Sequence, residues 1–160
     1  MKSKGFTLAE VIIAMAIMAI LAAIAAPNYR TYMANQRLKG AARQVMSDLM
    51  NARMMAVSKN QRVKVHFSIN NATSPDNHTY RIWNDANNDG TVADNEGDNI
   101  LRDIHPDYYD VTFSGTPDNP VFDPRGTAST GSIIVTSSRG SKYICISSAG
   151  RVRISNAACS

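Results

Sequence analysis

The feature that most constrains this chain is an apolar run near its N-terminus, from residue 6 to residue 26, in which Glu10 is the only charged side chain. A run of about 20 apolar residues is the length at which a helix crosses a bilayer. After Pro27 the chain has the mixed composition of a water-soluble protein. We therefore predict a membrane-spanning helix over about residues 6–26 and one globular domain in the rest of the 160-residue chain.

Three interpretations compete for this N-terminal segment. A secretory signal peptide would use Lys2 and Lys4 as its basic region and the segment Ala23-Ile24-Ala25, with small residues at its first and last positions, as its cleavage site. A plain transmembrane anchor is the second interpretation. The third is a short leader that is removed by a cut between Gly5 and Phe6.

Glu10 distinguishes the three interpretations. A carboxylate inside a membrane helix costs about 2.5–3.5 kcal/mol on insertion scales, so it needs a partner. A cut after Gly5 would create a new α-amine on Phe6, one helical turn before Glu10. That amine is a counter-charge in the same chain or in a neighbouring one, whereas a signal peptide or a plain anchor has no use for the acid. The sequence therefore favours the cleaved leader.

The hexapeptide from Gly5 to Glu10, GFTLAE, resembles the N-terminal signal of type IV pilins and type II secretion pseudopilins. The resemblance implies that a prepilin peptidase cuts after Gly5 and N-methylates Phe6, and that Glu10 guides assembly with other pilins or pseudopilins. It also implies a single-pass protein of the bacterial inner membrane, with its head in the periplasm, which later enters a pilus or pseudopilus.

The helical pattern continues beyond Pro27, where we expect a bend because proline removes a backbone donor. Apolar residues recur there at three- and four-residue spacing, which is typical of an amphipathic helix; they are Leu38, Ala41, Ala42, Val45, Leu49, Ala52 and Ala56. We therefore divide the chain into a leader over residues 1–5, one long helix over residues 6–59 and a β-rich head over residues 60–160.

Alternating apolar residues from Val63 to Ile69 predict a half-buried strand, with His66 on its polar face. Short strands separated by turns should pair in antiparallel fashion. Further strands are predicted at 79–83, 100–104, 109–113, 132–136, 142–147 and 151–154, and a surface loop at 70–77. The fold class is thus α+β.

The C-terminal half resembles the GspH/FimT branch of the pilin-like proteins. The resembling segments are VFDPRG at 121–126, GSIIV at 131–135 and ISSAGRVR at 146–153. The resemblance implies the pilin fold, in which a β-sheet head packs on the second half of the long helix. It also implies a minor subunit with a role at the filament tip or in priming, either in a type IV pilus or in a type II secretion system.

The charged residues of the head are unevenly distributed along the sequence, although the net charge of the whole chain is only +4. Apart from Glu10 and Asp48, all acidic residues lie between Asp76 and Asp123. All charged residues after Asp123 are basic. Arg151 and Arg153 share one face if the segment is extended, and paired arginines can grip successive phosphates. The motif GRVR resembles the GRxR signature of FimT-type minor pilins that bind DNA during natural transformation. The remaining DNA-binding candidates are Arg125, Arg139 and Lys142; an ordinary solvated surface is the alternative.

An acidic stretch fits the calcium-loop pattern D-x-[DN]-x-[DN]-G followed five residues later by Glu. Its oxygen donors would be Asp85, Asn87, Asp89, the Thr91 carbonyl and Glu96. Calcium prefers six to eight such oxygens. The predicted strands on either side do not fit the helix pair of an EF-hand, so the alternative is a polar turn between strands.

Cys145 and Cys159 are the two cysteines of the chain, and we predict that they form a disulfide that ties down the C-terminus. No sequence pattern points to an enzyme: the three histidines are scattered, and neither a nucleophile motif nor a phosphate loop is present. We therefore expect a structural or binding role without a required cofactor, calcium being the one candidate.

Overall fold

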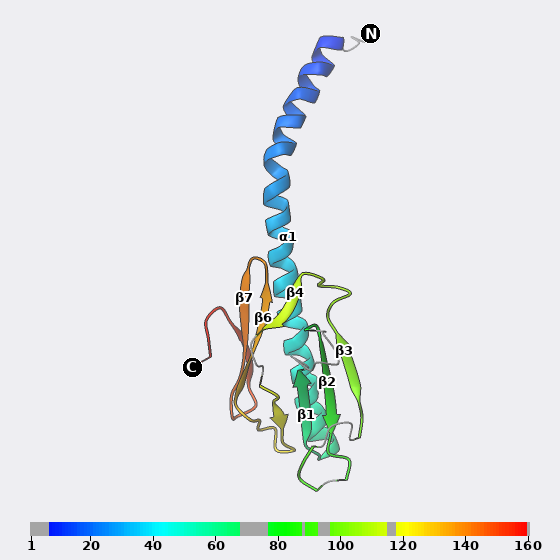
Figure 1. Ribbon diagram of the computed structural model, residues 1–160, viewed down its shortest axis with the longest axis vertical. Coiled ribbons are helices and arrows are strands. Elements are labelled where there is room, and N and C mark those ends of the chain that lie inside the picture. Colours follow the sequence, from blue (N-terminus) through cyan, green and yellow to red (C-terminus); the bar gives the residue numbers. More distant parts are fainter. Residues whose placement is uncertain (1–6, 68–76, 88, 93–96, 115–117, 160) are drawn as a thin grey trace, which may run out of the picture. The chain divides into compact units, whose positions relative to one another are not determined.

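The computed structural model describes residues 7–67, 77–87, 89–92, 97–114 and 118–159 (Figure 1). The chain divides into two compact units, Met1–Met33 and Ala34–Ser160, which are described separately. The helix α1, Leu8–Lys59, passes through Pro27 and belongs to both units. In the first unit every described side chain from Thr7 to Ala26 is exposed. This segment is long and apolar enough to cross a membrane.

In the second unit, α1 buries one face and leaves the other in water. The buried face carries small and branched apolar residues at three- and four-residue intervals, as the pattern predicts; they are Leu38, Ala41, Val45, Leu49, Ala52 and Ala56. Two antiparallel sheets pack around this face, and Figure 1 shows their strands around the second half of α1.

The first sheet has the order β3-β2-β1-β5 and the second has the order β4-β6-β7-β8. The strands of the first sheet are β1 Val63–Phe67, β2 Thr79–Asn84, β3 Ile100–Asp103 and β5 Val121–Phe122. The strands of the second sheet are β4 Val111–Ser114, β6 Gly131–Ser137, β7 Gly140–Ile146 and β8 Val152–Ser155. Both sheets and α1 contribute to a single hydrophobic core.

This architecture confirms the predicted α+β fold, a long N-terminal helix with an antiparallel head. Two details differ from the expectation. The strands form two sheets, because β4 pairs with β6 while β3 pairs with β2. The short strand β5 was not predicted, because its two residues precede a turn and show no alternation. Of the predicted loop at 70–77, residues 70–76 lie outside the described residues, as do the last two residues of the first predicted strand.

A polar link crosses the core between α1 and the first sheet. Asp48 on α1 is 4% exposed and accepts hydrogen bonds from the Tyr80 hydroxyl and, at 3.3 Å, from Gln44 Nε2. Burial and the bond to Asp48 raise the pKa of Tyr80 far above its usual value. Because a buried carboxylate is costly unless it is hydrogen-bonded, this pairing fixes which turn of α1 faces β2.

The connection between β3 and β4 is fastened to α1 by an ion pair. Arg37 Nε and Nη2 donate to the two carboxylate oxygens of Asp110 at 2.6 and 2.9 Å, and its guanidinium lies 4.5 Å from the centre of the Tyr109 ring. The hydrogen bonds from Arg37 lower the pKa of Asp110. Next to this pair, Tyr108 lies so close to Gly40 that a Cβ there would be 2.6 Å from its ring.

Candidate functional site

The N-terminal end of α1 carries a reciprocal cap. Glu10 Oε2 accepts hydrogen bonds from the Thr7 backbone N at 2.8 Å and from Thr7 Oγ1 at 2.9 Å, and Glu10 N donates to Thr7 Oγ1 at 3.3 Å. This is a capping box, whose T-x-x-E signature is visible in the sequence but was missed. The Glu10 carboxylate thus satisfies one backbone donor of the uncut chain, Thr7 N, and the Thr7 hydroxyl satisfies Glu10 N. Gly5 and Phe6 lie outside the described residues.

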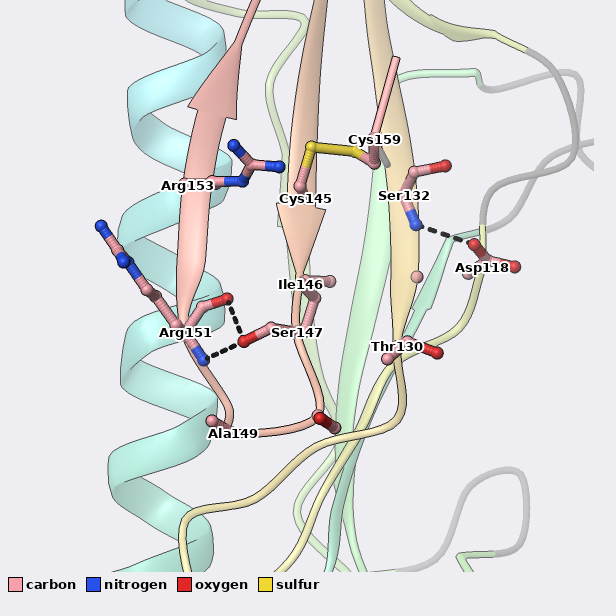
Figure 2. A pocket seen from close by; sticks show the side chains of 12 residues that line it. Asp118, Thr130, Ser132, Cys145, Ile146, Ser147, Ala149, Arg151, Arg153 and Cys159 are labelled. Carbon is pink, nitrogen blue, oxygen red and sulfur yellow. Dashed lines mark hydrogen bonds between the residues drawn. A yellow bond between two sulfur atoms is a disulfide. The ribbon is translucent and has the colours of Figure 1, made fainter.

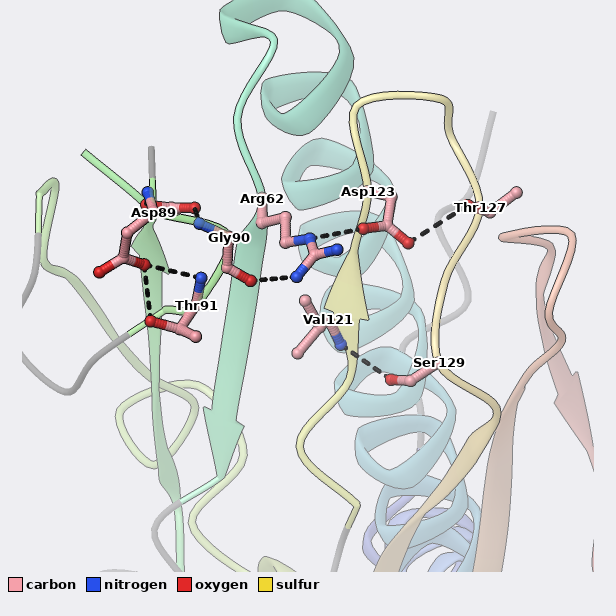
Figure 3. Close-up of polar contacts among 9 residues, drawn as sticks. Arg62, Asp89, Gly90, Thr91, Val121, Asp123, Thr127 and Ser129 are labelled. Carbon is pink, nitrogen blue, oxygen red and sulfur yellow. Dashed lines mark hydrogen bonds and ion pairs between the residues drawn. The ribbon is translucent and has the colours of Figure 1, made fainter. Parts of the chain in front are cut away.

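The predicted calcium loop is closed by its own backbone. Asp85 is 1% exposed, and its carboxylate accepts hydrogen bonds from the backbone N of Asp89 at 3.2 Å and of Gly90 at 2.9 Å. Asp89 Oδ1 accepts from Thr91 N at 2.8 Å and from Thr91 Oγ1 at 2.6 Å, as Figure 3 shows. The bonds from Thr91 lower the pKa of Asp89. Asn87 Oδ1 likewise accepts from Asp89 N at 2.9 Å.

These contacts are those of a polar turn. Within the described residues, no group of three or more His, Cys, Asp or Glu side chains could hold a metal ion. Glu96, the expected bidentate ligand, lies outside the described residues. Calcium binding therefore stays a prediction, and the described part of the loop fits the alternative of a turn.

Arg62 joins this loop to the turn that follows β5. Its Nη1 donates to the Gly90 carbonyl, and its Nε donates to Asp123 Oδ1 at 2.9 Å (Figure 3). Arg125 follows in the same turn and lines a cleft together with Arg62 and Asp123. Arg125 therefore lies at the end of the head where the two loops meet.

A groove of about 820 Å³ brings the two arginines of GRVR together; we call it the arginine groove. Figure 2 shows Arg151 and Arg153 on one side and Asp118 on the other. Both arginines are exposed, and Val152 between them is 4% exposed and faces the core. The alternation of exposed and buried residues from Arg151, just before β8, to Arg153 places the two arginines on the outer side of the second sheet, as predicted for an extended segment.

The predicted disulfide is confirmed and forms part of this groove. Cys145 and Cys159 are bonded, with their Cα atoms 5.6 Å apart. Cys145 lies directly opposite Arg153 in the antiparallel pairing of β7 with β8. The disulfide therefore holds the C-terminal segment over the sheet next to Arg153, which is visible in Figure 2.

Two glycines, Gly126 of VFDPRG and Gly150 of ISSAGRVR, lie against each other. Gly126 and Gly150 both have positive φ, +80° and +71°. Arg53 on α1 donates from Nε to the Gly126 carbonyl at 2.8 Å, and a Cβ on Gly150 would collide with that carbonyl oxygen and lie 2.9 Å from Arg53 Nε. The helix, the turn after β5 and the turn before β8 thus share one junction, which no local pattern indicated.

The other basic candidates lie away from the arginine groove. Arg139 is in the turn between β6 and β7, at the opposite end of β7 from Ile146, which lines the groove. Lys142 donates a hydrogen bond to Asn156 Oδ1. A strand advances about 3.3 Å per residue, so the seven residues of β7 separate the two ends by roughly 20 Å. Neither side chain lines the groove.

Sequence comparison places this architecture in a known family. The family of the type II transport protein GspH matches residues 41–150. The chain belongs to the GspH family. A second family, the prokaryotic N-terminal methylation motif, matches residues 1–26 of this GspH-family protein. Among curated proteins, none has a significantly similar sequence.

Solved structures with the same fold include two pilin-like proteins. One is the type IV minor pilin FimU of Pseudomonas aeruginosa, at 18% identity and a TM-score of 0.53, over 74% of this chain and 92% of that chain. A second crystal form of FimU gives 17% identity and a TM-score of 0.55, over 78% and 92%. The other protein is the minor pseudopilin EpsH from the type 2 secretion system of Vibrio cholerae, at 11% identity and a TM-score of 0.54, over 75% and 97%.

The family and the methylation motif identify this GspH-family protein as a filament subunit of the type IV pilus or type II secretion kind. The family implies assembly with other pilin-like subunits and processing by a prepilin peptidase, and the N-terminal helix is long and apolar enough to anchor the chain in a membrane. The family is one of structural proteins.

Proposed function

We propose that this GspH-family protein is a minor subunit that is stored in the bacterial inner membrane with its head in the periplasm and then assembled into a filament. In this proposal residues 1–5 are a leader, residues 6–59 form the assembly helix and residues 60–160 form the head. The observation that carries it is the helix segment from Thr7 to Ala26, whose described side chains are all exposed. Such a segment requires lipid or other helices around it.

The processing step has a direct test. Mass spectrometry of the protein from its host should give a chain that starts at Phe6 and carries one added methyl group. Replacing Gly5 with a bulky residue should leave the precursor uncut, whereas replacing Ser3, two residues upstream, should not. An intact Met1, or a new N-terminus near residues 23–25, would contradict the proposal.

The arginine groove supports a second candidate function, the binding of DNA at phosphate groups. Arg151 and Arg153 are exposed and line the same groove; Arg151 directly precedes β8, and Arg153 lies on β8 opposite the disulfide-bonded Cys145. Among the residues that line the groove Asp118 is the one acid, and no acid follows Asp123 in the chain. Binding through two such contacts would be weak, independent of sequence and sensitive to salt. The alternative is a minor pseudopilin of type II secretion whose head has only a structural role in priming or at the tip.

The double variant Arg151→Ala, Arg153→Ala tests the DNA function. In a gel-shift assay at low salt it should lose the shift that the wild-type chain gives, because it lacks the side chains that contact the phosphates. Any binding that remains should depend less on salt, since fewer phosphate charges are neutralised. Arg139→Ala is the matched control, since Arg139 is exposed but lies outside the groove. An equal loss in the control would show that net charge alone attracts DNA. Absence of a shift with the wild-type chain would leave the structural role of a pseudopilin.

A further inference from the structure

The fold brings together two histidines that the sequence leaves far apart. The ring centroids of His78 and His105 are 4.6 Å apart, with their planes inclined at 58°. His78 directly precedes β2 and is half-buried, while His105 follows β3 by two residues and is exposed. The pair lies in the head, away from the residues that line the arginine groove.

The ring of His78 has a defined tautomer. Its Nδ1 lies 2.8 Å from the carbonyl oxygen of Val111. A carbonyl only accepts hydrogen bonds, so Nδ1 carries the hydrogen and, in the neutral ring, Nε2 keeps its lone pair. Histidines that bind metals almost always donate their second ring N–H to a carbonyl or a carboxylate in this way. His78 is therefore prepared as a metal ligand through Nε2.

Backbone hydrogen bonds hold both histidines in place. Ile104 N donates to the His78 carbonyl at 3.1 Å, and Phe113 N donates to the Asn77 carbonyl at 2.8 Å. His105 N donates to Asp103 Oδ1 at 2.8 Å. The two rings thus project from segments fixed to β3 and β4, so little chain ordering is needed to use them as a pair.

We propose that His78 and His105 form a two-imidazole binding site for a divalent transition metal such as Cu²⁺ or Zn²⁺. Imidazole nitrogen suits these metals, and Cu²⁺ binds most tightly of the common divalent ions. The described residues offer no third His, Cys, Asp or Glu ligand at this place, so water completes the coordination. A bound metal would link the start of β2 to the connection between β3 and β4.

The test uses the full chain in detergent, without a histidine tag, and Cu²⁺ as the probe. Electron paramagnetic resonance should show one bound Cu²⁺ per chain with coupling to imidazole nitrogen. His78→Gln and His105→Gln should each weaken binding by about tenfold or more, in line with losses seen for even indirect changes to metal sites. His66→Gln is the matched control, because His66 stacks on Trp83 at 5.3 Å and not on another histidine.

Thermal unfolding, followed by the fluorescence of Trp83, shows whether a variant still folds. His105 is exposed, so His105→Gln should melt like the wild-type chain in the absence of metal. A metal that binds only the folded state raises the melting temperature, so Cu²⁺ should stabilise the wild-type chain and the His66 variant but not the His105 variant. The proposal is overturned if the His105 variant binds as tightly as the wild type, or if the wild type binds no Cu²⁺ below millimolar concentration.

Discussion

Replacing Glu10 with glutamine is expected to abolish the incorporation of this protein into filaments while leaving the processed subunit anchored in the membrane. The reason is electrostatic. A carboxylate among apolar helices costs several kcal/mol unless a cation lies beside it, and cleavage after Gly5 would supply the α-amine of Phe6. Glutamine cannot form this ion pair, so a subunit that carries it has no charge to match the amine of its own or a neighbouring chain.

The capping box gives Glu10 a competing role that the experiment must separate. In the uncut chain Glu10 accepts hydrogen bonds from Thr7 N and Thr7 Oγ1, and a glutamine oxygen can accept the same bonds. A helix-capping role therefore predicts that Glu10→Gln assembles and that Thr7→Ala is impaired. A charge-pairing role predicts the reverse.

The two variants are compared by sedimenting sheared filaments and by blotting the membrane fraction for the unassembled subunit. The expected result is Glu10→Gln in the membrane fraction alone and Thr7→Ala in both fractions. Correct processing of both proteins, checked by mass spectrometry, shows that a loss of assembly is not a loss of cleavage. Normal assembly of Glu10→Gln would remove the charge-pairing role.

The parts of this protein that the sequence predicts well are those determined by local patterns. The exposed apolar segment follows from length and composition, and the buried face of α1 from the spacing of Leu38, Val45 and Leu49. Strand β1 ends at Phe67 in the described residues, and its burial alternates as its sequence does. The disulfide followed from the pairing of two cysteines near one end of the chain.

The parts that the sequence did not predict depend on contacts between distant segments. Strand β5 exists because Val121 and Phe122 pair with β1, far earlier in the chain. The hydrogen bonds of Asp85 and Asp89 are those of the polar turn that the sequence offered as the alternative to a calcium loop, but the link that Arg62 makes from this turn to Asp123 joins segments far apart in the chain. A sequence pattern identifies the side chains that carry oxygen atoms, but it does not show which hydrogen-bond donors the fold places next to those oxygens.

The structure gives the glycine of the GRVR motif a demanding structural role. Gly150 lies against the Gly126 carbonyl, which itself accepts a hydrogen bond from Arg53 on α1. A side chain at position 150 would push apart the helix, the turn after β5 and the turn that begins the arginine groove. The motif therefore joins a structural glycine to two exposed arginines.

Gly150→Ala should accordingly be one of the most destabilising single changes in the head. The left-handed backbone at φ +71° costs a residue with a Cβ about 1–2 kcal/mol, and overpacking adds about 1–3 kcal/mol. Gly90→Ala is the matched control: its φ is +87°, but the nearest atom to a new Cβ is Arg62 Nη1 at 3.8 Å, so it should lose only the backbone part.

Urea unfolding of the full chain in detergent measures both losses. Its signal is the fluorescence of Trp83, the one tryptophan in the sequence, which is 4% exposed. Equal losses in the two variants would mean that the junction yields to a methyl group. A larger loss for Gly150→Ala, partly relieved when Arg53 is also replaced by alanine, is the expected result, because removing the Arg53 side chain frees the space on one side of the new Cβ and lets the Gly126 turn move away.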